Sequence, residues 1–401
     1  MRRETAVSAD ARRANAAIVY DHLLRHSPCS RKDLREATGL VSGTVTAIVS
    51  DLTARGLVRE TGEVLATGGR PQRLMEVVSA RVLGAVVMVT TSSVEAALVD
   101  LAGQERWSAV VPHKGVVQGA PALLSVLERV LREAASRAEQ EPGAWYAGAV
   151  VTVPGLVTDG RTMVTTLEMP MRDVAVVEEL ERALGPGHQV RLLNSGRTAA
   201  LAEWARLSPQ ERPQSMAYIS LHGRGVSGGL VQDGRLVAGE HGLAGEVGHI
   251  VVESDGAACE CGARGCLATV ATLETLTRAA GADPELNEEQ WAAWLCQRAQ
   301  AGDEQVRRAL ERAARGVAAA VATLSNLTDV GLVVLGGQAQ ALAAWLMPPV
   351  QEMLASRARV NPVFNPRVVV GQDLGGALRE GMVQELGRGV RTDPLAVPEL
   401  G

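Results

Sequence analysis

The sequence predicts an α/β protein in which a small winged helix-turn-helix unit precedes a larger, two-lobed body. Three observations carry this prediction: two short helices joined by a glycine turn near the start, strands that alternate with helices from residue 80 onward, and a cluster of cysteines in the second half. The 401 residues suffice for two or three domains. We expect one domain at 1–78 and a second at 79–401, whose lobes cover about 79–195 and 196–401.

The charge of the chain is unevenly distributed. Residues 1–80 carry 12 Lys and Arg against 9 Asp and Glu, a net charge of +3, so the body must carry −8 to reach the total of −5. A basic segment on an acidic body indicates that any nucleic acid is bound by the N-terminal part. No apolar run reaches the roughly 18–20 residues that a membrane span needs. The charged start is not a secretory signal, so we expect a cytoplasmic protein with reduced thiols.

The first eighty residues show the pattern of a helix-turn-helix. A first helix is predicted from Ala16, Ile18, Val19, Leu23 and Leu24, and Pro28 limits it. Ser30 with Asp33 three residues later resembles a capping box, and the helix that it starts should end at Gly39. In the next helix, Val45, Val49 and Leu52 share one face.

The second helix of such a pair enters the major groove of DNA with its N-terminal end forward. Its exposed positions, Ser42, Thr44 and Thr46, carry hydroxyls that suit base edges or phosphates, and Arg31 begins the helix before it. Two short apolar runs around "GGRP" predict a wing whose Arg70 suits a narrow minor groove. The alternative is a three-helix packing module that never meets DNA.

The body reads as two sets of strands with helices between them, and therefore as two α/β lobes with a cleft between them. Within it, "GRGVSGG" matches the dinucleotide pattern G-x-G-x-x-G. That pattern needs a helix next, because a helix N-terminus holds the pyrophosphate. The next residues are instead "LVQDGRLVAG", two apolar runs around the hairpin dipeptide Asp233-Gly234. We therefore expect no nicotinamide or flavin site here.

The stretch "GHIVVESDGAACECGARGC" holds three of the five cysteines. His249, Cys259, Cys261 and Cys266 make a complete Cys3His set for a tetrahedral structural zinc, with zinc loop 249–266. Three thiolates favour Zn²⁺ over magnesium or calcium. The alternative, unliganded thiols on a surface loop, would leave them open to oxidation.

These residues resemble the ROK family of repressors, open reading frames and sugar kinases. The signature "GLAGEVGHI…CECGARGCL" carries the resemblance, and "VTVPGLV", "LLNSGRTAALAE" and "VGLVVLGG" occur in family order. The winged helix with "GGRP" is similar to that of ROK repressors. The resemblance implies an actin-like (RNase H-like) sugar-kinase fold, homo-oligomerisation as a dimer or tetramer, one structural zinc and sugar sensing between the lobes.

The resemblance also implies where a kinase would need its catalytic groups. ROK kinases use an Asn-Asp pair, with the aspartate as general base, at the positions of Asn194 and Ser195. A serine with no base beside it cannot take up that proton near neutral pH. The family's glycine-rich first phosphate motif falls on "VTTSS", which has neither glycine nor acid. Phosphoryl transfer depends on positioning and electrostatics at this centre, so we expect no enzyme activity.

The sugar site is partly preserved, since Asn194, Glu246 and His249 match positions that touch sugar hydroxyls in the family. Two carboxylates of the standard site are missing, because Ser195 and Ala268 stand in their places. A phosphorylated or otherwise acidic sugar is repelled less by such a site than by the family's usual one. The alternative is a cleft that has lost its ligand.

We therefore predict a transcriptional regulator, most simply a repressor of carbohydrate-related genes. Two subunits would present their winged helices to a roughly palindromic operator in double-stranded DNA, and a sugar or sugar-phosphate effector would shift their spacing. Two alternatives remain: a ROK sugar kinase with a DNA-binding appendage, and a zinc-stabilised scaffold with no DNA partner.

Overall fold

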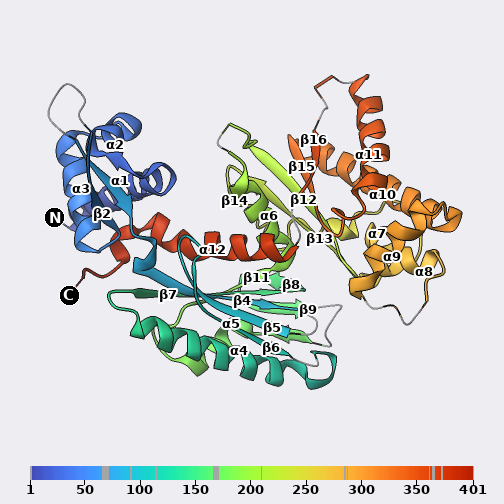
Figure 1. Cartoon of the computed structure of the whole chain (residues 1–401), viewed down its shortest axis with the longest axis horizontal. Helices are drawn as coiled ribbons and strands as arrows, with labels where there is room; N and C mark the ends of the chain where they lie inside the picture. Colours follow the sequence, from blue (N-terminus) through green and yellow to red (C-terminus); the bar gives the residue numbers. More distant parts are fainter. Residues whose placement is uncertain are drawn as a thin grey trace.

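The structure is a computed structural model that describes residues 2–400, except for 66–71, 91–92, 113–114, 166–170, 209, 284–285, 287, 361, 364–365 and 372–373. It consists of a small N-terminal unit and two lobes, each built on a five-stranded sheet (Figure 1). None of the described helices is long and apolar enough to cross a membrane.

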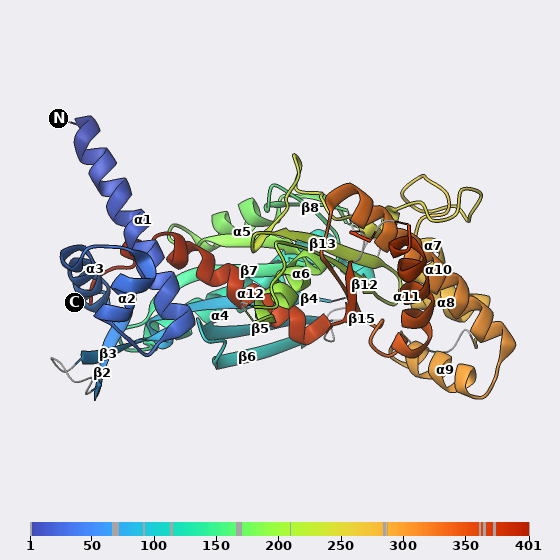
Figure 2. The same cartoon turned by 90° about the horizontal axis from the view of Figure 1, so that it is seen from above.

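The N-terminal unit contains three helices and a three-stranded sheet. The helices are α1 (Arg2–His26), α2 (Arg31–Thr38) and α3 (Ser42–Ala54); the strands, in the order β1-β3-β2, are β1 (Cys29–Ser30), β2 (Val58–Leu65) and β3 (Gln72–Val77). The antiparallel pair β2–β3 is the predicted wing. Strand β1, which pairs with β3, was not predicted, because two residues show no periodicity. In Figure 2 the first half of α1 extends away from the rest.

Local sequence signals start and stop these helices as predicted. The backbone N–H of Ser30 donates to the Asp33 carboxylate at 2.8 Å, and the Asp33 N–H donates back to Ser30 Oγ at 3.3 Å. These bonds hold the pKa of Asp33 below its usual range. Gly39 ends α2 in the left-handed conformation, with φ of 70°.

The buried faces of these helices agree with the predicted spacing, with one exception. Val45, Val49 and Leu52 of α3 are buried. In α1 the buried stripe includes Val19 and Tyr20, whereas Ile18 is 50% exposed. Including Ile18 in the apolar face was therefore wrong, because it lies outside the i, i+3, i+4 stripe that the helical period allows.

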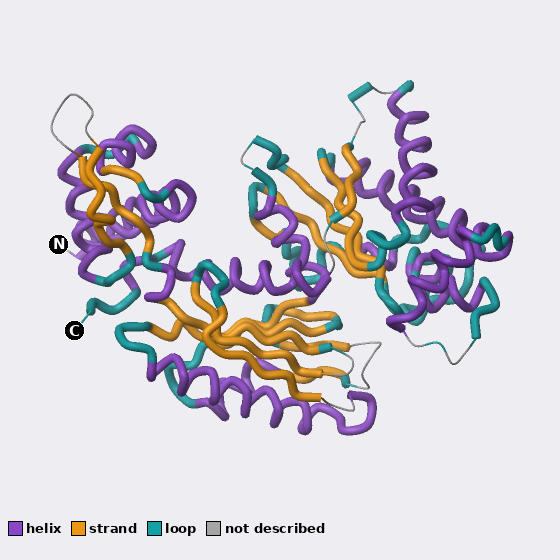
Figure 3. The backbone as a smooth tube through the Cα atoms, in the orientation of Figure 1, coloured by secondary structure: helices purple, strands orange, loops and turns teal. Residues whose placement is uncertain are grey.

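The first lobe has the strand order β11-β7-β4-β5-β6. Its strands are β4 (Val82–Val89), β5 (Ser93–Asp100), β6 (Glu105–Pro112), β7 (Trp145–Val153) and β11 (Val190–Asn194). Two helices, α4 (Gly115–Gln140) and α5 (Val176–Leu184), cover one face of this sheet (Figure 3). A small sheet of β8 (Leu156–Thr158), β9 (Thr162–Thr165) and β10 (Arg172–Val174) lies beside it.

The second lobe has the strand order β14-β13-β12-β15-β16. Its strands are β12 (Ser215–Leu221), β13 (Val226–Gln232), β14 (Arg235–Leu236), β15 (Leu332–Gly337) and β16 (Arg367–Val370). Its helices are α7 (Ala268–Ala271), α8 (Leu273–Ala279), α9 (Glu288–Gln300), α10 (Glu304–Thr328) and α11 (Ala343–Ala358). The alanine-rich α10 packs its apolar face into the main core of this lobe.

The glycine motif of this lobe is a strand-packing device, as its hairpin context predicts. β12 runs antiparallel to β13, and Asp233 and Gly234 at the next turn both have positive φ. A Cβ at Gly228 would lie 2.4 Å from Val247, and one at Gly229 would lie 2.8 Å from the Ala200 side chain. These glycines allow close packing of β13 against its neighbours.

Two helices, α6 (Ser195–Arg206) and α12 (Leu374–Thr392), join the lobes. Their buried residues share one core with β4, β5 and β7 of the first lobe and with β12 and β15 of the second. The chain after α12 then reaches the N-terminal unit, where Val390 and Val397 complete the core. This differs from the expected division, which placed all of 196–401 in the second lobe. Periodicity shows that α12 has an apolar face, but not which sheet covers it.

Candidate metal centre and effector site

The candidate metal centre is assembled by a short 3-10 turn and a loop. His249 ends the turn η2 (Val247–His249), Cys259 and Cys261 lie on the loop, and Cys266 comes just before α7. Two isolated bridges, Val251–Cys266 and Ala258–Arg264, fold the loop back on itself. Gly265 is required there, because its φ is +69° and a Cβ would lie 1.6 Å from the Glu253 carbonyl oxygen.

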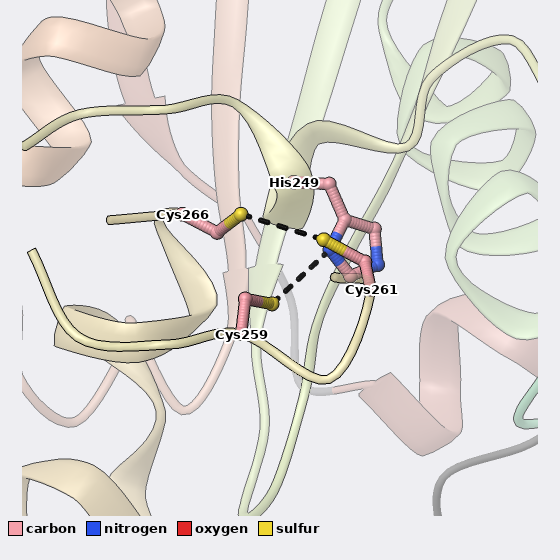
Figure 4. Close-up of side chains that lie close together, drawn as sticks. All are labelled: His249, Cys259, Cys261 and Cys266. Atoms are coloured by element: carbon pink, nitrogen blue, oxygen red, sulfur yellow. Dashed lines mark hydrogen bonds between the residues drawn. The ribbon is translucent and has the colours of Figure 1, made fainter. Parts of the chain in front are cut away.

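The four predicted ligands come together, with one ligand atom of each within 4.8 Å of the others (Figure 4). His249 Nδ1 lies 3.6 Å from Cys259 Sγ, and Cys261 Sγ lies 3.6 Å from Cys266 Sγ. A tetrahedral zinc with bonds of about 2.0–2.3 Å places neighbouring ligand atoms roughly 3.5–3.8 Å apart. The spacing therefore fits Zn²⁺.

The protonation chemistry of the cluster fits a cation as well. Burial, together with the Cys261 and Cys259 sulfurs, raises the pKa of Cys266 to about 12. Metal binding requires the thiolate form, so a bound cation would favour loss of the Cys266 proton. Burial also lowers the pKa of His249, which favours the neutral, metal-binding imidazole. Figure 4 shows Nδ1 facing the sulfurs and the other ring nitrogen on the far side.

An ion pair that the sequence did not reveal holds this loop to α10. Arg312 donates from Nε and Nη2 to the two carboxylate oxygens of Glu253, at 2.7 and 2.6 Å. Such a two-point contact fixes orientation as well as distance. With four protein ligands and a loop tied at its base, the centre has no open coordination position and is structural.

Asn194, a predicted effector residue, caps the N-terminus of α6. Its Oδ1 accepts the N–H of Arg197 at 3.1 Å, and its Nδ2 donates to the Gly155 carbonyl at 2.8 Å. Counting contacts with the described residues, one N–H and one lone pair of this amide remain unused.

Glu246, the second predicted effector residue, lies at the start of η2, and the His249 N–H donates to its carbonyl at 3.1 Å. Burial raises the pKa of its carboxyl group, and the nearby Arg197 lowers it. Within the described part of the chain, no hydrogen bond or ion pair holds this carboxylate.

Arg197 is a residue that the sequence reasoning did not single out. From the first turn of α6, its guanidinium donates to the carbonyls of Gly242 and, at 3.4 Å, Val237, on the segment that leads to Glu246. Its Nε is buried without a partner among the described residues, and burial lowers its pKa. The sequence feature that could have indicated it is an arginine in the alanine-rich stretch "NSGRTAALAE".

A separate pocket of about 200 Å³ lies between β4, β5 and α12. Val86, Met88, Ala97 and Met382 contribute its apolar lining, and Glu95 and Arg379 contribute charges. None of the predicted effector residues lines it.

The predicted DNA-contacting residues lie on the N-terminal unit. Ser42 and Thr46 are exposed on α3, whereas Thr44 is half-buried. Arg31 begins α2, and its guanidinium lies 3.6 Å from the Glu60 carboxylate of β2. Arg70 lies outside the described residues.

Comparisons with known proteins agree with this architecture. A family model described as "ROK family" matches residues 87–377. The "DNA-binding transcriptional dual regulator NagC" of Escherichia coli (strain K12) is 26% identical over 365 residues, which cover 86% of this chain and 85% of that protein. An N-acetylmannosamine kinase of Citrobacter koseri is 35% identical, but over 176 residues, or 43% of this chain and 57% of the kinase.

A solved structure also resembles the chain over nearly its whole length. It is titled as a ROK family transcriptional regulator, homolog of the E. coli MLC protein. It has a TM-score of 0.74 and 23% identity, and covers 94% of this chain and 99% of that one. At this identity the match supports the two-lobed fold with its N-terminal unit.

Proposed function

Because the chain belongs to the ROK family, and His249, Cys259, Cys261 and Cys266 are the zinc-binding motif typical of that family, we propose that it is a DNA-binding transcriptional repressor of carbohydrate-related genes. One observation carries the proposal: a helix-turn-helix with a wing is built onto the ROK body. The match to NagC covers 86% of this chain, whereas the kinase match covers 43%.

The proposed DNA interface is the N-terminal end of α3. Its N-cap residue, Val41, offers no side-chain cap and is 71% exposed. An uncapped helix N-terminus with hydroxyls at Ser42 and Thr46 suits phosphate oxygens and base edges. Arg31 and Arg70 would add contacts to the backbone and the minor groove. A dimer or tetramer would present two such helices to a palindromic operator.

Ser42→Glu tests this interface. A carboxylate at the N-terminal end of α3 would face DNA phosphates. We therefore expect the affinity of the protein for DNA to fall about 10- to 100-fold, for the operator and for other sequences alike. The operator is first found by genomic binding-site mapping, and affinities are then measured by fluorescence anisotropy. Ser136→Glu, on an exposed position of α4 in the first lobe, is the matched control. Equal effects of the two substitutions, or no sequence enriched by the wild type, would contradict the proposal and favour the scaffold.

We also propose that the body has lost kinase activity. Ser195 is buried on the first turn of α6, and a serine at the family's aspartate position has no carboxylate to accept the sugar proton. Purified protein with ATP, Mg²⁺ and a panel of hexoses and amino sugars should form no sugar phosphate above the no-protein control. A phosphorylated product detected by mass spectrometry would instead support the ROK sugar kinase with a DNA-binding appendage.

The proposed effector is a sugar or sugar phosphate held by Asn194, Glu246 and His249. The Glu246 carboxylate has no hydrogen bond or ion pair among the described residues, and the far nitrogen of His249 is free of the metal cluster. Asn194 caps α6, which packs against α12, and the end of α12 contacts the N-terminal unit. A ligand that binds one arrangement of α6 more tightly would shift the population of DNA-binding geometries.

A further inference from the structure

We propose that Arg197 makes the effector site select a sugar that carries an anionic group, a carboxylate or a phosphate, over the corresponding neutral sugar. This proposal rests on the proposed function only in placing the effector beside Asn194 and Glu246. It adds a residue and a chemical class to that site.

The contacts of Arg197 leave its charge incompletely satisfied. The guanidinium is half-buried and donates to two backbone carbonyls, of Gly242 and of Val237, and the second contact is long at 3.4 Å. The Nε donor is buried without an acceptor among the described residues. A half-buried cation whose hydrogen-bond acceptors are neutral carbonyls is incompletely compensated, and an anion that contacts Nη2, on the exposed side of the guanidinium, would relieve it.

Glu246 does not complete the pairing. The two groups are close enough to influence each other electrostatically, but no ion pair joins them within 4.0 Å in the described part of the chain. Each can thus serve a different part of one ligand. A carboxylate accepts sugar hydroxyls, whereas a guanidinium matches the planar or tripod oxygens of an anion.

The local electrostatics favour an anion at this end of α6. Arg197 lies in the first turn of a helix of 12 residues, where the backbone dipole also attracts negative charge. The sequence supplies no acid at Ser195 or Ala268, the two positions that carry carboxylates in ROK kinases. A neutral sugar would leave the guanidinium without an anionic hydrogen-bond acceptor, because no ion pair joins it to Glu246 within 4.0 Å in the described part of the chain.

A purely structural role is the competing explanation. Arg197 joins α6 to the segment 237–242, so it could do no more than hold the loop before Glu246 in place. In that case, removing the Arg197 side chain would weaken the binding of neutral and anionic sugars equally, or would lower only the stability of the protein. Selectivity, expressed as the ratio of two affinities, separates the two roles.

The test is isothermal titration calorimetry of the full-length protein with matched pairs: glucose with glucose 6-phosphate, glucose with glucuronate, and N-acetylglucosamine with its 6-phosphate. We expect at least one anionic member to bind more tightly than its neutral partner. Arg197→Gln should reduce that ratio by about 10- to 100-fold, because a charge-assisted hydrogen-bond pair is lost. Arg197→Lys should retain part of it, since the charge remains without the fork. Inorganic phosphate alone shows whether any isolated anion suffices.

Arg206→Gln, at the far end of the same helix, is the control and should leave the ratio unchanged. The proposal is overturned if wild type prefers neutral sugars, if no anionic sugar binds at millimolar concentration, or if Arg197→Gln keeps the wild-type ratio. The calorimetry needs no DNA. A negative result for sugar selectivity therefore leaves the repressor proposal standing, and a negative result for operator binding still allows the selectivity to be interpreted.

Discussion

Cys266→Ala is expected to release the zinc and to lower the melting temperature by about 5–10 °C, the shift that a loss of about 3 kcal/mol gives in a domain of this size. Cys266 is fully buried, and its sulfur lies 3.6 Å from that of Cys261. Its removal leaves one imidazole and two thiolates, too few to close a tetrahedral structural site. Metal content by atomic emission and melting by calorimetry are measured on the same protein.

Cys296→Ala is the matched control for this experiment. Cys296 is a half-buried cysteine on α9 outside the cluster. We expect this variant to keep its zinc and to melt within a few degrees of wild type. A metal content and melting temperature unchanged in Cys266→Ala, or equal effects of the two variants, would count against a structural zinc.

Arg81→Ala is expected to loosen the N-terminal unit from the body and to weaken operator binding at least 10-fold. The buried Arg81 donates to three carbonyl oxygens: Arg55 at the end of α3, Gly143 in the first lobe, and Pro398 near the end of the chain, at 2.6, 2.8 and 2.7 Å. Its loss removes three part-buried hydrogen bonds from a charged donor, at a cost of about 2–4 kcal/mol.

Hydrogen exchange measures this effect region by region. Faster exchange is expected in α1 to β3, with the second lobe unchanged, because the core of the N-terminal unit includes Val390 and Val397 from the end of the chain. Val397→Asp should have the same effect through that core, since it places a carboxylate where no side-chain surface is exposed. The exposed Arg137 is the control position. If Arg81→Ala raised hydrogen exchange equally in all regions of the chain, Arg81 would not be a specific junction between the N-terminal unit and the body.

Much of the fold was predictable because its signals are local. The capping box of Ser30 and Asp33, the left-handed Gly39 and the Asp233-Gly234 hairpin each depend on residues within a few positions of one another. The four zinc ligands were also predictable, since ligand type and spacing alone define such a site. The effector and DNA contacts stay predictions until ligands are tested.

Other features depend on residues that are distant in the chain. Strand β1 exists only because β3, more than forty residues later, lies beside it. Arg197 was overlooked because a cation in an alanine-rich helix shows its partners only when the segment before Glu246 folds against it.

The order of the elements, the helix-turn-helix with its wing, the zinc ligand set and the family resemblance could all be inferred from the amino-acid sequence. Short-range backbone preferences, turn chemistry and metal-ligand types depend on neighbouring residues. Three features could be seen only in the folded chain: α12 returns from the second lobe, Arg81 joins the end of α3 to a carbonyl 317 residues further along, and Arg197 donates to the segment that leads to Glu246. Apolar faces and buried charges acquire their partners only when distant segments pack together.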